Sequence, residues 1–281
     1  MRVLVTGAGG QLGRDVVTRC EAAGDDVLRA DRGMLDVTDR DSVFGAVTSW
    51  RPQVLINTAA WTAVDACEAD PDRAFASNAL SVRWLSDACE RVEAHLVHVS
   101  TDYVFSGDQH EPNNEWDAPA PGNVYGASKL AGEREAMESA SIVRSSWVCG
   151  MHGANMVKTV LRLIGQPGPL RFVDDQIGHP TFTADLAPML RRLAVDRRRG
   201  IHHVTNQGVV SWYEFAREVV TAAGDDPARV EPIKTVDLQP PRPAARPANS
   251  VLDNAVLRMS GLPLLRDFRE PLVELVRELR A

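Results

Sequence analysis

The chain of 281 residues has an apolar fraction of 44%, a charged fraction of 25% and a formal net charge of −7. This is the composition of an ordinary globular protein, and the negative charge argues against a general nucleic-acid-binding protein, which gathers positive charge along the phosphate path. No apolar run approaches the roughly 20 residues that a transmembrane helix needs. Because a strand-like segment begins within the first few residues and leaves no room for a signal peptide, we expect a cytoplasmic protein with no membrane partner.

The first half of the sequence alternates two hydrophobic periodicities. Apolar residues at helical spacing predict helices after Gln11, over Val43–Trp50 and from Pro71 to Cys89. Between these helices, segments rich in β-branched residues predict strands. The predicted strands are Val3–Thr6, Val27–Ala30, Val54–Asn57, Leu96–Ser100 and Ile142–Val148. Strands and helices in alternation form βαβ units, so the fold class is predicted to be α/β, a Rossmann-type doubly wound parallel sheet.

After about residue 150 the alternation becomes less regular. Helical spacing predicts helices at Asn155–Ile164, Thr181–Val195, Ser211–Ala223 and Asp267–Leu279, and the proline-rich stretch Gln239–Pro247 is expected to be a loop. The four cysteines lie far apart without metal-site spacing, so no metal site is predicted, and Cys20 and Cys89 are expected to be buried.

A glycine-rich turn follows the first predicted strand and opens the first predicted helix. Gly7 permits a tight turn, Gly10 lets a diphosphate approach the backbone, and Gly13 lets the helix pack closely on the strand. The amide groups at the start of such a helix hold an anion. Residues 1–150 are therefore predicted to form a dinucleotide-binding domain, and residues 151–281 a smaller, mainly substrate-binding C-terminal lobe with some segments returning to the first domain.

The second predicted strand ends in Asp31 and Arg32, which bear on the choice of cofactor. An acid at this place binds the ribose 2′-hydroxyl of NAD, whereas an arginine accommodates the 2′-phosphate of NADP. Because both are present side by side, NADH and NADPH remain open. Asp36 and Val37 close the next apolar segment, where they could contact adenine or form a plain turn.

Three further side chains predict hydride chemistry. Thr101 ends the fourth strand, at the sheet edge where ligands bind, and Tyr125 and Lys129 lie one turn apart on a helix. A phenol near an ammonium can act as a proton donor, and a hydroxyl can polarise a carbonyl under hydride attack. Taken alone, Tyr125 and Lys129 could equally be a surface pair; together with the glycine turn and Thr101 they predict a catalytic set.

Several longer motifs resemble the extended short-chain dehydrogenase/reductase family over nearly the whole chain. The two motifs most typical of one branch are Asp174–Thr181 and Arg246–Ser250. The others are Gly9–Gly13, Asn57–Asp65, Ser100–Phe105 and Tyr125–Lys129. The branch that they resemble reduces nucleotide-linked keto-deoxysugars. The resemblance implies NAD(P)H-dependent reduction of the C4 keto group of dTDP-4-dehydro-6-deoxy-L-mannose to dTDP-L-rhamnose.

The resemblance also implies roles for individual residues. Thr101, Tyr125 and Lys129 would be the catalytic triad, with Lys129 orienting the cofactor ribose and lowering the pKa of the Tyr125 phenol. The residues that would line the cofactor are Gly10, Gln11, Leu12, Asp36, Val37, Ala59, Ala60 and Trp61, the last at a place where the family usually has tyrosine. Those that would hold the sugar are Thr62, Val64, Thr101, Asp102, Tyr103 and Trp147. Arg246 could neutralise the diphosphate or be a structural arginine, and Trp147 could face the substrate or pack the lobe.

Alternative functions remain at this point. The substrate could be another dTDP-4-keto-6-deoxysugar, or the chain could be a non-catalytic NADP-binding regulatory subunit resembling that of methionine adenosyltransferase. A dehydratase is disfavoured because Tyr103 follows Asp102 where dehydratases place a glutamate base. A homodimer is left open, since the acidic residues of metal-bridged relatives cannot be located in this sequence.

Overall fold

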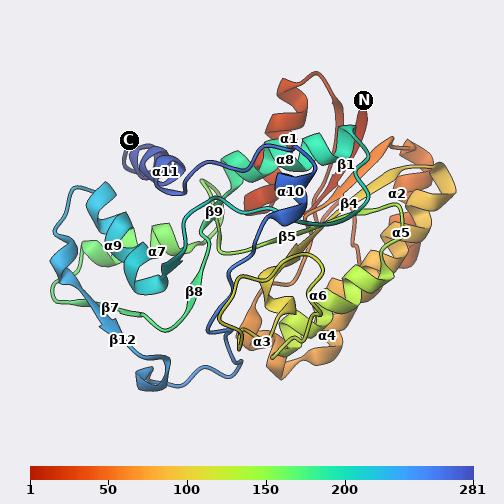
Figure 1. The fold of residues 1–281 in the computed structure, drawn as a ribbon. Helices are drawn as coiled ribbons and strands as arrows, with labels where there is room; N and C mark the ends of the chain where they lie inside the picture. The colour runs from red at the N-terminus through yellow and green to blue at the C-terminus, as the bar shows by residue number, and fades with distance from the viewer.

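A six-stranded parallel sheet forms the centre of the structure, a computed structural model that describes all 281 residues (Figure 1). Its strand order is β10-β5-β4-β3-β1-β2, and every neighbouring pair is parallel. The strands are β1 (Arg2–Thr6), β2 (Asp26–Ala30), β3 (Val54–Asn57), β4 (His95–Thr101), β5 (Ser141–Ser145) and β10 (Gly200–His203). The prediction of a doubly wound α/β fold is thereby confirmed, and the strand order reverses between β1 and β3, where such sheets bind ligands.

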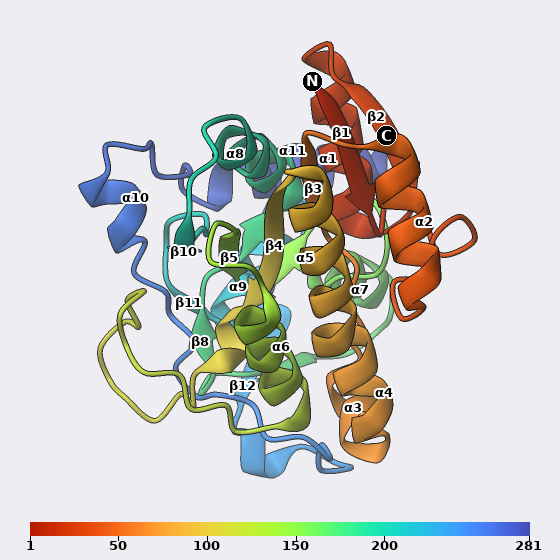
Figure 2. The same ribbon diagram turned by 90° about the vertical axis from the view of Figure 1, so that its right-hand side faces the viewer.

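Helices cover both faces of the sheet (Figure 2). Helices α1 (Gln11–Ala22) and α8 (Thr183–Val195) pack on one face, while α2 (Arg40–Trp50), α5 (Ser81–Val92) and α6 (Val124–Glu135) lie on the other. Successive side chains of a strand point to opposite faces, and β1 shows this directly. Val3 and Val5 belong to the core under α1 and α8, whereas Leu4 belongs to the core under α2 and α5.

The helix predicted from Pro71 to Cys89 is continuous but contains one wider turn. It consists of α4 (Pro71–Phe75), a π-helical turn (Ala76–Leu80) and α5. The short α3 (Val64–Ala69), which the sequence did not indicate, precedes it. Within the wide turn, the Asn78 amide donates to the Trp61 carbonyl at 3.1 Å and to the Ser128 hydroxyl at 3.0 Å. Asn78 thus joins the loop after β3 to α6.

The prediction of one strand over Ile142–Val148 was wrong. β5 ends at Ser145, Trp147 has a left-handed φ of 46°, and β6 (Val148–Cys149) pairs with β9 (Thr181–Phe182) outside the main sheet. The Ser146 hydroxyl donates to the His179 carbonyl at 2.7 Å, which fixes the point where the chain leaves the sheet. Because β9 takes up Thr181 and Phe182, α8 begins at Thr183 rather than at the predicted Thr181.

The remaining elements build a lobe with its own core beside the sheet (Figure 1). Its helices are α7 (Met156–Ile164), α9 (Trp212–Ala222) and α11 (Arg269–Arg280). Its strand pairs are β7 (Leu170–Val173) with β12 (Val230–Ile233) and β8 (Ile177–Gly178) with β11 (Val210–Ser211). Three short 3₁₀ helices are also present: Asp102–Val104 follows β4 of the main sheet, Pro227–Arg229 precedes β12, and Thr235–Asp237 follows β12. α8, β10 and α10 (Ala255–Met259) return to the main sheet. None of the helices is both long and apolar enough to cross a membrane.

Candidate active site

Two adjoining cavities form one groove at the carboxyl ends of the strands. The first, here called the nucleotide cavity, has a volume of about 560 Å³. Among its lining residues are Gly7, Gly10, Asp31, Arg32, Asp36, Val37, Ala59, Ala60 and Trp61. The second, here called the catalytic cavity, has a volume of about 460 Å³. Among its lining residues are Gln11, Leu12, Thr62, Val64, Thr101, Asp102, Tyr103, Tyr125, Lys129 and Trp147. Gly10, Thr58 and Ala60 border both cavities, so the groove is continuous, and of the predicted site residues only Arg246 lies outside it.

The glycine turn leaves the start of α1 open to an anion. Gly10 is the N-cap residue, no side chain caps the helix, and its first turn carries no acid. A β-carbon on Gly13 would lie 2.1 Å from the Gly7 carbonyl oxygen, so only glycine permits this close turn. The free amide groups of a helix N-terminus and its dipole favour a phosphate. The turn therefore fits the diphosphate of a dinucleotide.

The side chain of Gln11 connects this turn to the lobe. Its amide nitrogen donates to the Val148 carbonyl at 2.9 Å, and its oxygen accepts from the Asn155 amide at 2.7 Å. Gln11 therefore borders the groove while its polar atoms hold the segment after β5. This tie spans more than a hundred positions of the sequence, and no local pattern indicates it.

The acids beside the nucleotide cavity shape their own loops. Asp31 accepts from the backbone amides of Gly33 and Met34 at 3.0 and 3.1 Å. Asp36 accepts from the amide and the hydroxyl of Thr38, and these hydrogen bonds hold the pKa of Asp36 below its ordinary value. Arg32 borders the cavity next to Asp31. Both groups that bear on NADH and NADPH thus border the nucleotide cavity.

Tyr125 and Lys129 are buried, so the surface-pair interpretation was wrong. Their exposed fractions are 8% and 1%. α6 carries both into the catalytic cavity, and its start is fixed by Asn123, whose side chain accepts from the Gly126 amide at 2.7 Å. Thr101 reaches the same cavity from the end of β4. The structure therefore brings the three predicted catalytic side chains together.

The ammonium of Lys129 lies against β4. Its Nζ donates to the Val99 carbonyl at 2.7 Å and lies 3.3 Å from Nε2 of His98. Burial lowers the pKa of Lys129 to about 8, although Glu133 opposes this shift. Burial also lowers the pKa of His98 well below its usual value, and the Asn57 amide lies 2.9 Å from Nδ1 of the ring. His98 is therefore a neutral, hydrogen-bonded core residue.

Burial keeps the Tyr125 phenol protonated in this structure. Burial raises its pKa above the ordinary value, and a hydrogen bond with Thr101 only partly opposes that effect. The expected lowering of this pKa by Lys129 is not seen, because the lysine amine points to the Val99 carbonyl. A phenol that keeps its proton at neutral pH is suited to protonate an oxygen on which negative charge develops.

Two tryptophans form the wall of the catalytic cavity next to the lobe. The rings of Trp147 and Trp212 stack with centroids 3.5 Å apart and an interplanar angle of 8°. Trp147 therefore meets both of its sequence interpretations, since it borders the cavity and packs against the lobe. Trp212 was missed, because a tryptophan at the start of a helix carries no signal of its distant partner.

Arg246 is engaged by a carboxylate. Its guanidinium donates to both oxygens of Asp65 at 2.6 and 2.8 Å and to the Ala244 carbonyl at 2.7 Å. Only 8% of its side chain is exposed. Of the two interpretations left open by the sequence, this geometry favours the structural one, in which Arg246 attaches the proline-rich loop to α3.

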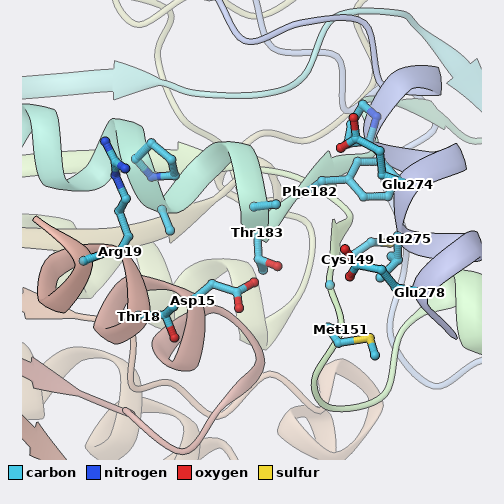
Figure 3. Close-up of a pocket in the computed structure, with 16 residues that line it drawn as sticks. Asp15, Thr18, Arg19, Cys149, Met151, Phe182, Thr183, Glu274, Leu275 and Glu278 are labelled. Carbon is cyan, nitrogen blue, oxygen red and sulfur yellow. The ribbon is translucent and has the colours of Figure 1, made fainter. Parts of the chain in front are cut away.

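A separate cavity lies between α1, α8 and α11 (Figure 3). Asp15 and Thr18 of α1 face Glu274 and Glu278 of α11 across it, with Phe182 and Thr183 at the start of α8 (Figure 3). It shares no lining residue with the groove. The chemistry described above is therefore confined to the groove.

Known proteins resemble the chain along its whole length. A family model described as the RmlD substrate binding domain matches residues 1–281. A dTDP-4-dehydrorhamnose reductase of Streptomyces griseus is 43% identical, over 97% of this chain and 92% of that protein. A probable dTDP-4,6-dihydroxy-2-methyloxan-3-one 4-ketoreductase of Streptomyces antibioticus is 41% identical, over 98% and 94%. The crystal structure of a dTDP-4-dehydrorhamnose reductase from Bacillus anthracis in complex with NADP is 38% identical, covers 99% of both chains and superposes with a TM-score of 0.94. The chain therefore belongs to the RmlD substrate binding domain family.

Proposed function

We propose that the protein is an NAD(P)H-dependent reductase that converts dTDP-4-dehydro-6-deoxy-L-mannose (dTDP-4-dehydrorhamnose) to dTDP-L-rhamnose. The observation that carries this proposal is the continuous groove, in which an uncapped glycine turn adjoins Thr101, Tyr125 and Lys129. The names of the reductases that the chain resembles support the same reaction.

The cofactor would lie along the nucleotide cavity. The amide groups after Gly10 would hold its diphosphate, and Asp31 and Arg32 border the region for its adenosine ribose. When bound, NADPH or NADH supplies the hydride. Lys129 borders the catalytic cavity, where its amine would meet the second ribose.

The chain supplies the proton and the polarisation of the ketone. Tyr125 keeps its proton because it is buried, and it would give this proton to the C4 oxygen of the sugar. Thr101 would donate a hydrogen bond to the same oxygen, where negative charge grows as hydride arrives. Trp147 and Trp212 would form the wall against the sugar.

A second candidate is reduction of a different dTDP-4-keto-deoxysugar. The Streptomyces antibioticus relative is named as a 4-ketoreductase of such a sugar and is nearly as similar as the rhamnose enzymes. The two candidates share the proposed catalytic groups, so the walls of the catalytic cavity decide between them.

The test is product identification with a panel of dTDP-4-ketohexoses, each supplied with NADPH and with NADH. We expect stoichiometric oxidation of the cofactor with the rhamnose precursor, and NMR of the product should show the L-rhamnose configuration at C4. Preferred turnover of another sugar would select the second candidate. Absence of turnover with every sugar, with NADPH bound, would favour the non-catalytic regulatory interpretation.

Further aspects of the proposal concern the assembly and location of the protein. Three earlier expectations stay predictions: a cytoplasmic location, a substrate-binding lobe formed mainly by residues 151–281, and the absence of a nucleic-acid partner. The net charge of −7 supports the absence of a nucleic-acid partner. A homodimer also stays a prediction. Sedimentation of the purified protein with and without chelator would test the homodimer and any metal bridge.

A further inference from the structure

The hydroxyl group of Thr101 is already committed to another protein group. Its Oγ1 donates to Oδ1 of Asp102 at 2.9 Å, accepts from the Tyr103 amide at 3.2 Å, and is in hydrogen-bond contact with the Tyr125 phenol. A threonine hydroxyl has one hydrogen and two lone pairs. While its hydrogen points to Asp102, Thr101 presents only a lone pair to a ketone oxygen, which has lone pairs of its own. In that state Thr101 cannot polarise the substrate.

Asp102 lies in surroundings that suit a neutral acid. Its exposed fraction is 2%, and its Oδ2 is buried without a hydrogen-bond partner. The neighbouring Ser250 hydroxyl, whose hydrogen bond with Asp102 lowers the Asp102 pKa, also lies 3.2 Å from the Ile177 carbonyl and can donate its single hydrogen to only one of the two. An ionised carboxylate needs donors to both oxygens, and here one is left bare. Burial accordingly raises the pKa of Asp102 to about 7, despite hydrogen bonds that favour the ion.

No salt bridge offsets this burial. Arg246 is paired with Asp65, and Lys129 donates to the Val99 carbonyl. Burial raises the pKa of Tyr103 to about 12 and that of Tyr125 further, so both phenols are neutral near pH 7. Tyr103 and Tyr125 carry the titratable groups that interact with Asp102, Lys129 borders the same cavity, and Cys67, Arg242 and Arg246 interact with the two tyrosines. Asp102 forms no ion pair with any of them.

We propose that Asp102 is a positioning residue that sets the direction of the Thr101 hydroxyl. In its acid form Asp102 donates to Thr101 Oγ1, and the Thr101 hydroxyl donates to the keto oxygen of the substrate. In its ionised form Asp102 accepts the hydrogen bond of the Thr101 hydroxyl instead. Only the acid form lets Thr101 accept from the Tyr103 amide and from Asp102 while it donates to the ketone. This inference rests on the proposed function, since it assigns a pH-dependent step to the same site.

The position of the carboxyl proton follows from its neighbours. A proton on Oδ1 faces the Thr101 oxygen at 2.9 Å, whereas a proton on Oδ2 has no acceptor. The acid form also removes a negative charge from beside the oxygen that becomes negative during reduction. Ionisation of Asp102 therefore weakens catalysis in two ways, by withdrawing a donor and by adding a charge.

The first experiment compares the turnover of the wild type and Asp102→Asn from about pH 5 to about pH 9, which spans about two units on each side of the Asp102 pKa of about 7. An asparagine amide donates to Thr101 at every pH. We expect the ratio of Asp102→Asn to wild-type turnover to be constant below about pH 6 and to rise about tenfold per pH unit above about pH 7. This ratio cancels the titration of Lys129, which both proteins share. A flat ratio across the whole range would overturn the proposal.

Two further variants separate a positioning role from a merely structural one. Thr101→Ser keeps the hydroxyl and should keep the wild-type pH dependence. Thr101→Val removes the hydroxyl, so the additional change Asp102→Asn should alter its pH profile much less than it alters the wild-type profile, through the charge of Asp102 alone. The control is Glu231→Gln, which removes an exposed carboxylate on β12 whose partner is Arg171, and should leave the profile unchanged. An equally large effect of Asp102→Asn in the Thr101→Val background would contradict the proposal.

The last measurement does not depend on turnover. An infrared difference spectrum between the wild type and Asp102→Asn, recorded without substrate, should contain a carboxylic acid carbonyl band that disappears around pH 7. Absence of this band at pH 6 would refute the proposal, whichever sugar is reduced. If the band titrates but no 4-keto sugar is reduced, the proposed reductase function fails instead. Wild-type spectra at two pH values give the same titration if the variant does not fold.

Discussion

The two cavities of the groove are built by different means. The nucleotide cavity is formed largely by backbone, through the glycine turn and the uncapped start of α1. The catalytic cavity is formed by side chains that come from β4, α6, the Trp147 segment and α9. A backbone site tolerates few substitutions at its close contacts, because no side chain can move to relieve them. A side-chain site can instead lose one group and keep its shape.

The largest effect is expected for Gly13→Ala. The new methyl group would lie 2.1 Å from the Gly7 carbonyl oxygen, so α1 must move away from β1. We expect destabilisation by about 3 kcal/mol or more and loss of measurable NADPH binding. Thermal unfolding and fluorescence titration with NADPH check both effects.

The matched control for this change is Gly45→Ala. Gly45 lies on the exposed side of α2, and a β-carbon there meets nothing within 4 Å. Because alanine favours a helix over glycine, this variant should be stabilised by up to about 1 kcal/mol and bind NADPH normally. Equal tolerance of both substitutions would contradict a turn fixed by backbone contact.

The next largest effect is expected for Tyr125→Phe in the catalytic cavity. The change removes the buried proton donor and leaves the ring, which lies 5.6 Å from the Tyr103 ring in an edge-on arrangement. Turnover should fall by about 10²- to 10⁴-fold, the usual contribution of a positioned general acid. Binding of NADPH and thermal stability should change little. Retained turnover would remove Tyr125 from the proposed mechanism.

A smaller effect is expected for Trp212→Leu, which removes the stacked partner of Trp147. Trp147 holds a strained left-handed φ of 46°, and the stack restrains it. An aromatic pair of this kind contributes about 0.5–1.5 kcal/mol, so KM for the sugar should rise by about two- to tenfold. NADPH binding should not change. Trp116→Leu, at an exposed loop tryptophan, is the control, and an equal rise in KM there would point to a nonspecific cause.

The difference between the backbone-formed and the side-chain-formed cavity also explains how much of the structure the sequence alone predicts. The strands, the glycine turn and the helix bearing Tyr125 follow from local periodicity and short motifs, which place Gly7, Gly10, Asp31 and Arg32 at the nucleotide cavity, whereas Ala59, Ala60 and Trp61 were expected from the family resemblance. The contacts of Gln11 with Val148, of Trp147 with Trp212 and of Arg246 with Asp65 join segments far apart in the chain. No local pattern encodes such contacts, so the catalytic cavity was predicted through its motif residues but without Trp212.

Local patterns also fail where a segment changes direction without a glycine or proline. The residues from Ile142 to Val148 have the composition of a strand, yet the chain leaves the sheet after Ser145 because Ser146 and β6 bond to the segment around β9. Local sequence patterns also do not show which partner a hydroxyl group bonds to. Thr101 was expected to donate to the substrate, and the structure places its hydroxyl oxygen 2.9 Å from Oδ1 of Asp102, a second partner for the same hydrogen.

The smallest effect is expected for Arg32→Ala. This variant tests whether one charged side chain changes the selectivity for NADPH over NADH in a cavity that is formed largely by backbone. Asp31 is bound to the amides of its own turn, so its carboxylate stays in place whichever cofactor is present. Arg32 borders the cavity beside it and is exposed, so a contact with the 2′-phosphate of NADPH is weakened by solvent and worth about 1 kcal/mol. The kcat/KM for NADPH should therefore fall about fivefold, and that for NADH should stay the same or rise. An equal fall with both cofactors would mean that Arg32 acts on a part that they share, and the selectivity would then have to come from the backbone.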